Sequence, residues 1–282
     1  MLATLWGTRG SIPSPGPTTV RYGGNTPCVE VQLVDGTELI LDAGTGIRAL
    51  GNKLVEEGNR PPIFVLMSHA HWDHVHGFPF FRPAYEPDWE IHVAGWSHSI
   101  QAIKDLLYTQ MDGLSFPVEF GQLQAGIDFM DLGHSVTRIQ SATLQLGLCS
   151  HPGGCCSFRI ESDGGGCLMH VTDNELGATG RDGEARRNAI TRLSEGADLL
   201  IHDAQFLPEE MGDHAGWGHS TYVDVLDMAA RASVPNVILF HHDPDRTDDQ
   251  IDHIVWRARQ YVESQKYDIQ CDAAREGMQI SL

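Results

Sequence analysis

The alternation of apolar and polar positions along the chain predicts several short strands. Residues 29–33 alternate strictly between apolar and polar side chains, which is typical of a strand with one buried face. Three mainly apolar runs, at 63–67, 198–201 and 237–240, are bounded by turns or polar loops. Such runs indicate strands that are buried on both faces.

Helical periodicity is found between and after these strands. A helix is expected over 47–57, and a second is expected over 222–232 with Ser220 or Thr221 as its cap. A third helix opens at 248–249. Its apolar residues recur at helical spacing: Ile251, Ile254, Val255, Ala258, Tyr261 and Val262. Strands interspersed with helices in this way predict an α/β fold in which helices cover the sheets.

Composition limits the class of protein. The 282 residues include 19 Lys+Arg and 38 Asp+Glu, so 19 − 38 gives a net charge of −19 with histidine neutral. With 41% hydrophobic and 20% charged residues, the chain is not disordered, collagen-like or a coiled coil. We find no internal repeat and no linker, and we therefore expect one domain over residues 1–282. The excess of negative charge argues against binding of a long nucleic acid or an anionic membrane, since both require clustered lysine and arginine.

The expected location of the chain is the cytoplasm. No apolar stretch approaches the roughly 20 residues needed to span a bilayer. The first residues lack the basic segment and apolar core of a signal peptide. The six cysteines form no CxxC motif, which argues against a disulfide framework or a cysteine–zinc site and in favour of a reduced protein.

The segment after the strand expected at 63–67 is rich in potential metal ligands. It reads His69-Ala70-His71-Trp72-Asp73-His74, with three histidines and one aspartate within six residues. This HxHxDH pattern should arise by chance in roughly one chain of this composition in three hundred. Neutral imidazoles are good zinc ligands, and a carboxylate beside them can hold a second metal ion.

The HxHxDH segment resembles the signature of the metallo-β-lactamase superfamily. Other segments resemble the remaining motifs of that family in their order along the chain: Asp42-Ala43-Gly44, Ser150-His151-Pro152, Thr172-Asp173-Asn174 and the histidines after 237–240. The resemblance implies a four-layer αββα sandwich, in which two mixed β-sheets are flanked by helices.

The resemblance also implies two divalent metal ions per chain. One ion would be held by His69, His71 and His151, the other by Asp73, His74 and either His241 or His242, and Asp173 would bridge them. Zn²⁺ is the first expectation, with Mn²⁺ or Fe²⁺ as alternatives, because histidine and aspartate accept all three. Asp42 is expected to orient a ligating imidazole by accepting its other N–H.

Two further segments resemble those of tRNase Z and its small-molecule phosphodiesterase relatives. Residues 200–205 resemble the His-Glu-Ala-Thr segment of that branch, and residues 218–221 resemble its His-Ser-Thr segment. The resemblance implies that His219 protonates the leaving oxygen and that Asp203 holds His219. A neighbouring carboxylate keeps an imidazole protonated, as a general acid requires. Asp73 would help to position the attacking water through the metals.

The expected substrate is a small phosphodiester, such as a cyclic nucleotide or another cyclic phosphate. Enzymes of the tRNase Z type carry an inserted arm that grips the RNA, and the spacing from His151 to Asp173 (173 − 151 = 22 residues) is too short to contain one. Hydrolysis of a carbon ester, thioester or lactam on the same metals is the alternative. We expect neither a long nucleic acid nor a membrane as partner, and a homodimer is left open.

Two glycine-rich segments near the N-terminus, 7–11 and 21–26, resemble those of bacterial phosphodiesterase-like hydrolases. Glycine permits close approach of the backbone to the metals, and Arg9 or Arg21 could then contact a phosphate. Two hairpin turns with surface arginines would explain the same residues equally well.

Overall fold

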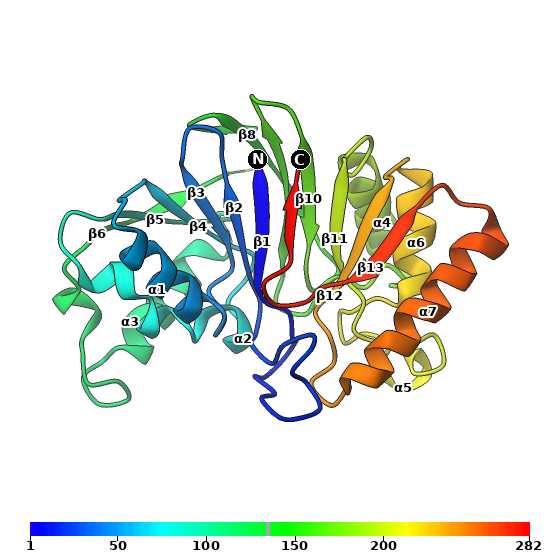
Figure 1. Ribbon diagram of the computed structural model, residues 1–282, viewed down its shortest axis with the longest axis horizontal. Helices are drawn as coiled ribbons and strands as arrows, with labels where there is room; N and C mark the ends of the chain where they lie inside the picture. Colours follow the sequence, from blue (N-terminus) through cyan, green and yellow to red (C-terminus); the bar gives the residue numbers. More distant parts are fainter. Residues whose placement is uncertain (134–135) are drawn as a thin grey trace.

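Two seven-stranded β-sheets form the centre of the molecule (Figure 1). The computed structural model describes residues 1–133 and 136–282. The first sheet has the strand order β14-β1-β2-β3-β4-β5-β6, and the second has the order β13-β12-β11-β10-β9-β8-β7. The strands are β1 (Leu2–Gly7), β2 (Cys28–Gln32), β3 (Glu38–Leu41), β4 (Ile63–Met67), β5 (Glu90–Gly95), β6 (Gly126–Asp131), β7 (Thr137–Ile139), β8 (Ala142–Leu148), β9 (Cys156–Ser162), β10 (Cys167–Val171), β11 (Leu199–Asp203), β12 (Asn236–Phe240), β13 (Gln270–Ala273) and β14 (Gln279–Ser281).

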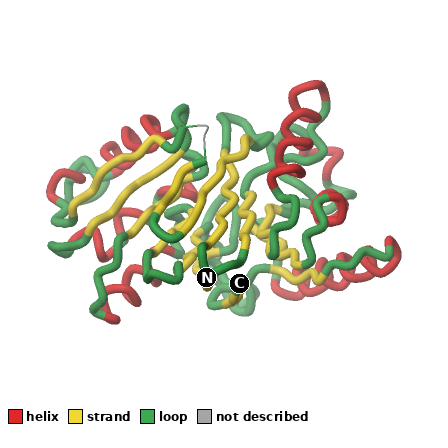
Figure 2. The backbone as a smooth tube through the Cα atoms, turned by 90° about the horizontal axis from the view of Figure 1, so that it is seen from above, coloured by secondary structure: helices red, strands yellow, loops and turns green. Residues whose placement is uncertain are grey.

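Helices cover the outer face of each sheet, which gives the molecule four layers (Figure 2). The helices are α1 (Ile47–Glu57), α2 (Trp72–Val75), α3 (Ile100–Gln110), α4 (Gly180–Leu193), α5 (Met211–His214), α6 (Tyr222–Arg231) and α7 (Asp248–Gln265). Helices α1 and α3 lie against the first sheet, and α4, α6 and α7 lie against the second. The predicted αββα sandwich is confirmed. In the described part of the chain, no helix combines the length and apolar character needed to cross a membrane.

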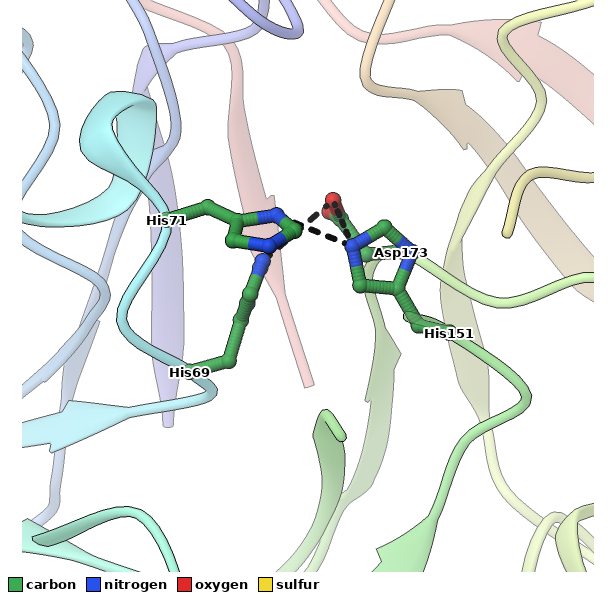
Figure 3. Close-up of side chains that lie close together, drawn as sticks. All are labelled: His69, His71, His151 and Asp173. Atoms are coloured by element: carbon green, nitrogen blue, oxygen red, sulfur yellow. Dashed lines mark hydrogen bonds and ion pairs between the residues drawn. The ribbon is translucent and has the colours of Figure 1, made fainter. Parts of the chain in front are cut away.

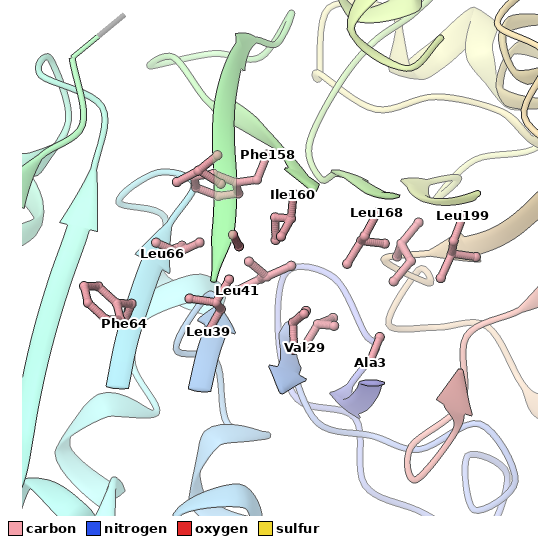
Figure 4. Packing of buried hydrophobic residues seen from close by; sticks show 14 of the residues in the cluster. Ala3, Val29, Leu39, Leu41, Phe64, Leu66, Phe158, Ile160, Leu168 and Leu199 are labelled. Atoms are coloured by element: carbon pink, nitrogen blue, oxygen red, sulfur yellow. The ribbon is translucent and has the colours of Figure 1, made fainter. Parts of the chain in front are cut away.

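The two sheets pack against each other through a continuous apolar layer. Buried side chains of the first sheet, such as Leu41 and Leu66, share this layer with Phe158 of the second (Figure 4). Two further apolar clusters fill the space between each sheet and its helices. In β3, Leu41 belongs to the layer between the sheets, whereas the preceding Ile40 packs beneath the helices, because successive side chains of a strand point to opposite faces.

Parallel strands bring several loops to one edge of each sheet. Strands β3 to β6 are parallel to one another, and so are β10 to β13. The carboxyl ends of neighbouring parallel strands lie at the same edge, where ligand sites of α/β proteins are built. The loops after β4, β10 and β12 contain most of the histidines and aspartates that the sequence singles out.

The predicted elements are present, with small differences at their ends. β4 matches the apolar run at 63–67, and α1 matches the helix expected over 47–57. Thr221 caps α6, because its hydroxyl accepts a hydrogen bond from the amide of Asp224. Ser220, the other predicted cap, is hydrogen-bonded instead to the loop after β10.

A buried carboxylate in β3 makes the stability of the fold depend on pH. The Glu38 side chain is 1% exposed, and one of its oxygens accepts a hydrogen bond from Gln32 while the other has no partner. Burial raises the pKa of Glu38 to about 7. Because this exceeds the value of about 4.3 in an unfolded chain, the stability that protonated Glu38 contributes is fully present below pH 4.3 and is lost as the pH rises to 7.

We therefore expect Glu38→Gln to raise the free energy of unfolding by about 1–3 kcal/mol at pH 8. The gain should be smaller at pH 5, where much of the wild-type carboxyl is protonated. Urea denaturation of both proteins at the two pH values measures this difference. The variant Glu90→Gln, at an exposed position of β5, is the matched control. An equal gain at both pH values would contradict the expectation.

Candidate metal centre

Loops from both sheets bring histidine and aspartate side chains to one place. His69 and His71 follow β4, His151 lies between β8 and β9, and Asp173 follows β10. Their ligand atoms lie within 4.8 Å of one another (Figure 3). His151 Nε2 is 3.0 Å from His71 Nδ1, and Asp173 Oδ2 is 3.5 Å from the Nε2 atoms of both His69 and His151.

A second group of ligand atoms shares Asp173 with the first. His74 Nε2 lies 3.1 Å and His241 Nε2 lies 3.2 Å from Asp173 Oδ1. Both nitrogens are also 3.2 Å from Asp73 Oδ2. The two oxygens of Asp173 thus face two different sets of ligand atoms, which is the geometry of a carboxylate that can bridge two cations.

The spacing of these atoms fits metal ions. Ligand atoms about 2.1 Å from a tetrahedral ion are separated from one another by about 3.4 Å, and the separations given above run from 3.0 to 3.5 Å. The Nε2 atoms of His69 and His74 are buried and have no hydrogen-bond partner. A buried unpartnered nitrogen destabilises the folded state, and a bound cation would satisfy both.

Three of the imidazoles are oriented by oxygen atoms that cannot donate a hydrogen bond. The acceptors are Asp42 Oδ2 for His74 (2.8 Å), the Gly218 carbonyl for His151 (3.1 Å) and Gln205 Oε1 for His241 (2.9 Å). Each Nδ1 must therefore carry the proton. In a neutral ring, this tautomer leaves Nε2 free to bind a metal ion.

Asp42 organises two of the histidines. Its Oδ2 accepts hydrogen bonds from His74 Nδ1 and from the Ser68 hydroxyl, both at 2.8 Å. Because the only hydroxyl proton of Ser68 is used in that bond, its oxygen can accept from His69 Nδ1 at 3.0 Å. The position of Asp42 agrees with its predicted role in orienting an imidazole.

The structure brings His241, and not His242, into the cluster. His242 Nε2 lies 2.8 Å from the carbonyl oxygen of Ala274, and its ring contacts Tyr22. The backbone of His241 has φ 61°, a left-handed conformation that is uncommon outside glycine. This turn directly after β12 points the two adjacent rings in different directions, and the geometry therefore favours His241 over His242 as the candidate ligand.

His219 lies at the edge of the cluster. Its Nδ1 is 2.8 Å from Asp203 Oδ2, and its ring stacks on that of His241 with centroids 5.1 Å apart. Burial alone would lower the pKa of His219, but the charge and hydrogen bond of Asp203 outweigh this effect and raise the pKa to about 9. A ring nitrogen of His219 also lies within 4.8 Å of ligand atoms of Asp173 and His241, so this side chain is within reach of a cation.

Two of the candidate ligands are neutral imidazoles, and the bridging carboxyl is ionised. Burial lowers the pKa of His69 well below its ordinary value and that of His151 to about 4. Burial opposes ionisation of Asp173, but the surrounding imidazoles, His241 first, hold the pKa of its carboxyl well below the usual range. These are the protonation states in which such side chains bind metal ions.

The N-terminal loop reaches the cluster through its backbone. The amide of Ser11 donates to Asp73 Oδ2 at 2.8 Å. A Cβ added at Gly10 would lie 2.4 Å from the His241 ring, so only glycine fits there. The predicted close approach of this glycine-rich segment is therefore observed.

The two arginines of the N-terminal segments do not reach the cluster. Arg9 is completely buried and donates to backbone carbonyls, among them that of Gly23 at 2.8 Å. Arg21 forms ion pairs with Asp249 and Asp252 of α7. Both arginines fix the N-terminal loop against its neighbours. The suggestion that one of them contacts a phosphate is thereby corrected, and Arg9 is not a surface residue.

Gly218 is required for the position of His151. Its φ is 92°, and an added Cβ would lie 2.1 Å from His151 Nδ1. Gly36, in the turn between β2 and β3, has a similar φ of 87° but meets nothing within 4 Å. We expect Gly218→Ala to displace His151 and to lower metal affinity by about 10-fold or more. Gly36→Ala is the matched control, which should cost about 1–3 kcal/mol of stability through backbone strain alone. Metal analysis of the two variants checks this difference, and equal metal content would contradict it.

A sequence profile of the beta-lactamase superfamily domain matches residues 37–242, which include every candidate ligand of the cluster. The chain belongs to the metallo-β-lactamase superfamily. As a member of this family it is a metal-dependent hydrolase, and the histidine–aspartate cluster is its divalent metal-binding region.

Relatives within the superfamily include nucleases. Ribonuclease Z of Lacticaseibacillus casei (strain BL23) is 25% identical over 256 aligned residues, which cover 77% of this chain and 79% of that enzyme. The metallo-beta-lactamase fold protein YhfI from Bacillus subtilis has a TM-score of 0.70 at 18% identity, covering 99% of both chains. The short form of human tRNase Z has a TM-score of 0.66 at 18% identity, covering 100% of this chain and 99% of that one. The two structural similarities support the fold.

The expectation that no long nucleic acid is a partner is contradicted by the relatives named ribonuclease Z. The physical reason is that net charge describes the whole chain and not one face of it. Helix α4 carries four arginines and only two acidic residues. Arg186 of this helix lines a hollow of about 290 Å³ beside His151, together with Asp182 and Glu175, so one cationic side chain lies close to the cluster.

Two residues that hold the site were not assigned a role from the sequence. Gln205 fixes His241, and a signal for it existed, because it occupies the place of the threonine in the His-Glu-Ala-Thr-like segment. Glu175 contacts the loop that precedes His219. No pattern in the sequence marks Glu175, because its contacts are with residues about forty positions away.

Proposed function

We propose that the protein is a phosphodiesterase that hydrolyses a small phosphodiester, such as a cyclic nucleotide or another cyclic phosphate. The observation that carries this proposal is the placement of His219, which is hydrogen-bonded to Asp203 and stacked on His241. An alkoxide leaving group needs a proton in the transition state. Hydrolysis of a thioester or lactam on the same metals does not require a dedicated acid at this position.

The proposed enzyme contains two divalent metal ions per chain, with Zn²⁺ as the first expectation. The proposed ligands are His69, His71 and His151 for one ion, Asp73, His74 and His241 for the other, and Asp173 for both. When bound, the ions supply Lewis acidity, which activates water and neutralises charge on the phosphate.

Side chains around the ligands complete the proposed mechanism. His219 uses Nδ1 to bond Asp203, which leaves Nε2 free to donate its proton to the leaving oxygen. Asp203 is itself held by the amides of Asn174 and Gln205, so the orientation of the imidazole is fixed before substrate binds. The Ser11 amide fixes Asp73 in the same way.

A compact substrate is supported by the connection between His151 and Asp173. The chain there forms only β9, a turn over 163–166 and β10, with no inserted arm. RNA is the second candidate substrate, because the relatives named ribonuclease Z favour it and Arg186 of α4 lines the hollow next to His151.

A substrate panel tests the proposal. Protein loaded with Zn²⁺ or Mn²⁺ is assayed with bis-p-nitrophenyl phosphate, cyclic nucleotides, a structured RNA, a thioester and a β-lactam. We expect hydrolysis of bis-p-nitrophenyl phosphate and of at least one cyclic nucleotide, and we expect a chelator to abolish both. If the protein cleaves RNA and none of the small phosphodiesters, RNA is the substrate and the proposal of a small phosphodiester is rejected. Turnover of only the thioester or lactam would reject phosphodiester chemistry.

A further inference from the structure

A buried carboxylate that the proposed mechanism does not use lies beside the cluster. Glu175 is 6% exposed. Its Oε2 accepts hydrogen bonds from the amides of Gly216 at 2.9 Å and Gly218 at 3.0 Å, and its Oε1 accepts from Gly216 at 3.0 Å. Among the described residues, no ion pair joins Glu175 to a cation, so the amides of two glycines compensate its charge.

These bonds fix a backbone segment that connects two functional side chains. The carbonyl oxygen of Gly218 accepts a hydrogen bond from His151 Nδ1 at 3.1 Å, and the next residue is His219. The main chain of Glu175 acts on the same region, because its amide donates to the carbonyl of Ser150 at 2.9 Å. Glu175 therefore joins the loops of His151 and His219 through both its side chain and its main chain.

The geometry of the glycine segment fits an anion. Gly216 and Gly218 have φ values of 86° and 92°, and their amides point toward one carboxylate. Closely spaced backbone amides in such conformations bind anions. Trp217, between the two glycines, is 59% exposed, and its amide donates to the carbonyl of His214 at 3.1 Å. The side-chain acceptor for the two glycine amides is Glu175.

We propose that Glu175 is a positioning residue, which holds the 216–218 backbone so that His151 faces its ligand group and His219 faces the leaving oxygen. The part that concerns His219 rests on the proposed function, whereas the part that concerns His151 rests on the ligand geometry alone. A carboxylate is required for this role. Glutamine has only one acceptor oxygen, and its amide group would place N–H donors against the glycine N–H groups.

The test compares Glu175→Gln with Asp198→Asn. Asp198 is the matched control, because its carboxylate also accepts a backbone hydrogen bond, from the Cys167 amide at 2.8 Å, but at the opposite end of β10 and β11. Three quantities are measured on Zn²⁺-loaded full-length protein. They are amide hydrogen exchange at Gly216 and Gly218, Zn²⁺ affinity by competition with a chelating dye, and turnover of phosphodiesters with good and poor leaving groups.

For Glu175→Gln we expect exchange at the two glycine amides to accelerate by at least about 10-fold, with the strands unchanged. Zn²⁺ affinity should fall by about 10–100-fold. At saturating Zn²⁺, turnover should remain more strongly reduced for the poor leaving group than for p-nitrophenolate, which needs no proton. A residue that served only stability would not change this ratio of turnover rates.

The proposal is overturned if Glu175→Gln matches Asp198→Asn in exchange and in Zn²⁺ affinity. If the wild-type protein hydrolyses no phosphodiester, the proposed function fails, while exchange and affinity still decide the role of Glu175. Should Glu175→Gln not fold, Glu175→Asp is measured instead, because it keeps the charge and shortens the reach by one methylene. Its exchange and affinity should then change in the same direction, and wild-type values in that variant would reject the proposal.

Discussion

Replacing Asp173 with asparagine is expected to remove at least one metal ion per chain and to lower turnover by on the order of 10³-fold or more. The reason is that each carboxylate oxygen of Asp173 faces a different set of ligand atoms, at 3.1–3.5 Å. An asparagine side chain has one oxygen and no charge, so it can serve only one set. Metal analysis and initial rates on bis-p-nitrophenyl phosphate measure the two effects.

Two further substitutions of aspartate by asparagine show whether the effect of Asp173→Asn comes from its bridging position or from the loss of a negative charge in general. Asp42→Asn should lower metal affinity by about 10–100-fold, because Asp42 orients His74 and Ser68 without lying in either ligand group. Asp198→Asn, at the far end of the same sheet as Asp173, should leave metal content unchanged. Retention of two ions by Asp173→Asn would remove Asp173 from the bridging position.

The features that could be predicted from the sequence are those specified by local residue patterns. The apolar run at 63–67 predicted β4, since a central parallel strand must be apolar on both faces. The HxHxDH segment is equally local, because its four side chains belong to one loop and the short helix α2. With these two features in place, the order of the remaining motifs was enough to predict the fold.

Features that depend on contacts between distant residues could not be predicted. The choice between His241 and His242 depends on a left-handed backbone at His241, which no sequence pattern marks, and on a hydrogen bond that Gln205 Oε1 accepts from His241 Nδ1. Strand β14 is three residues long and exists because β1 pairs with it. The expectation about nucleic acid was wrong for a related reason. Net charge averages over the whole chain, so it does not show that α4 has more arginines than acidic residues.

His219→Asn is expected to lower turnover of a phosphodiester with an alcohol leaving group by about 10²–10⁴-fold, and that of a p-nitrophenyl ester by less than about 10-fold. The alcohol must leave with a proton, whereas p-nitrophenolate is stable as an anion at neutral pH. His219 is suited to supply the proton because Asp203 holds its Nδ1 at 2.8 Å and keeps the ring charged. The ratio of the two rates for wild type and variant is the measurement. His253→Asn on the exposed side of α7 is the control.

The same variant distinguishes an acid from a metal ligand. A ring nitrogen of His219 lies within 4.8 Å of ligand atoms of Asp173 and His241, so loss of a ligand would also reduce activity. Loss of a ligand lowers metal content and slows both substrates to the same extent, because both depend on the same ions. Loss of an acid leaves metal content intact and slows only the substrate that needs a proton. If turnover of both substrates falls equally and bound metal also falls, His219 is a metal ligand. The proposed mechanism would then have no proton donor for the leaving oxygen.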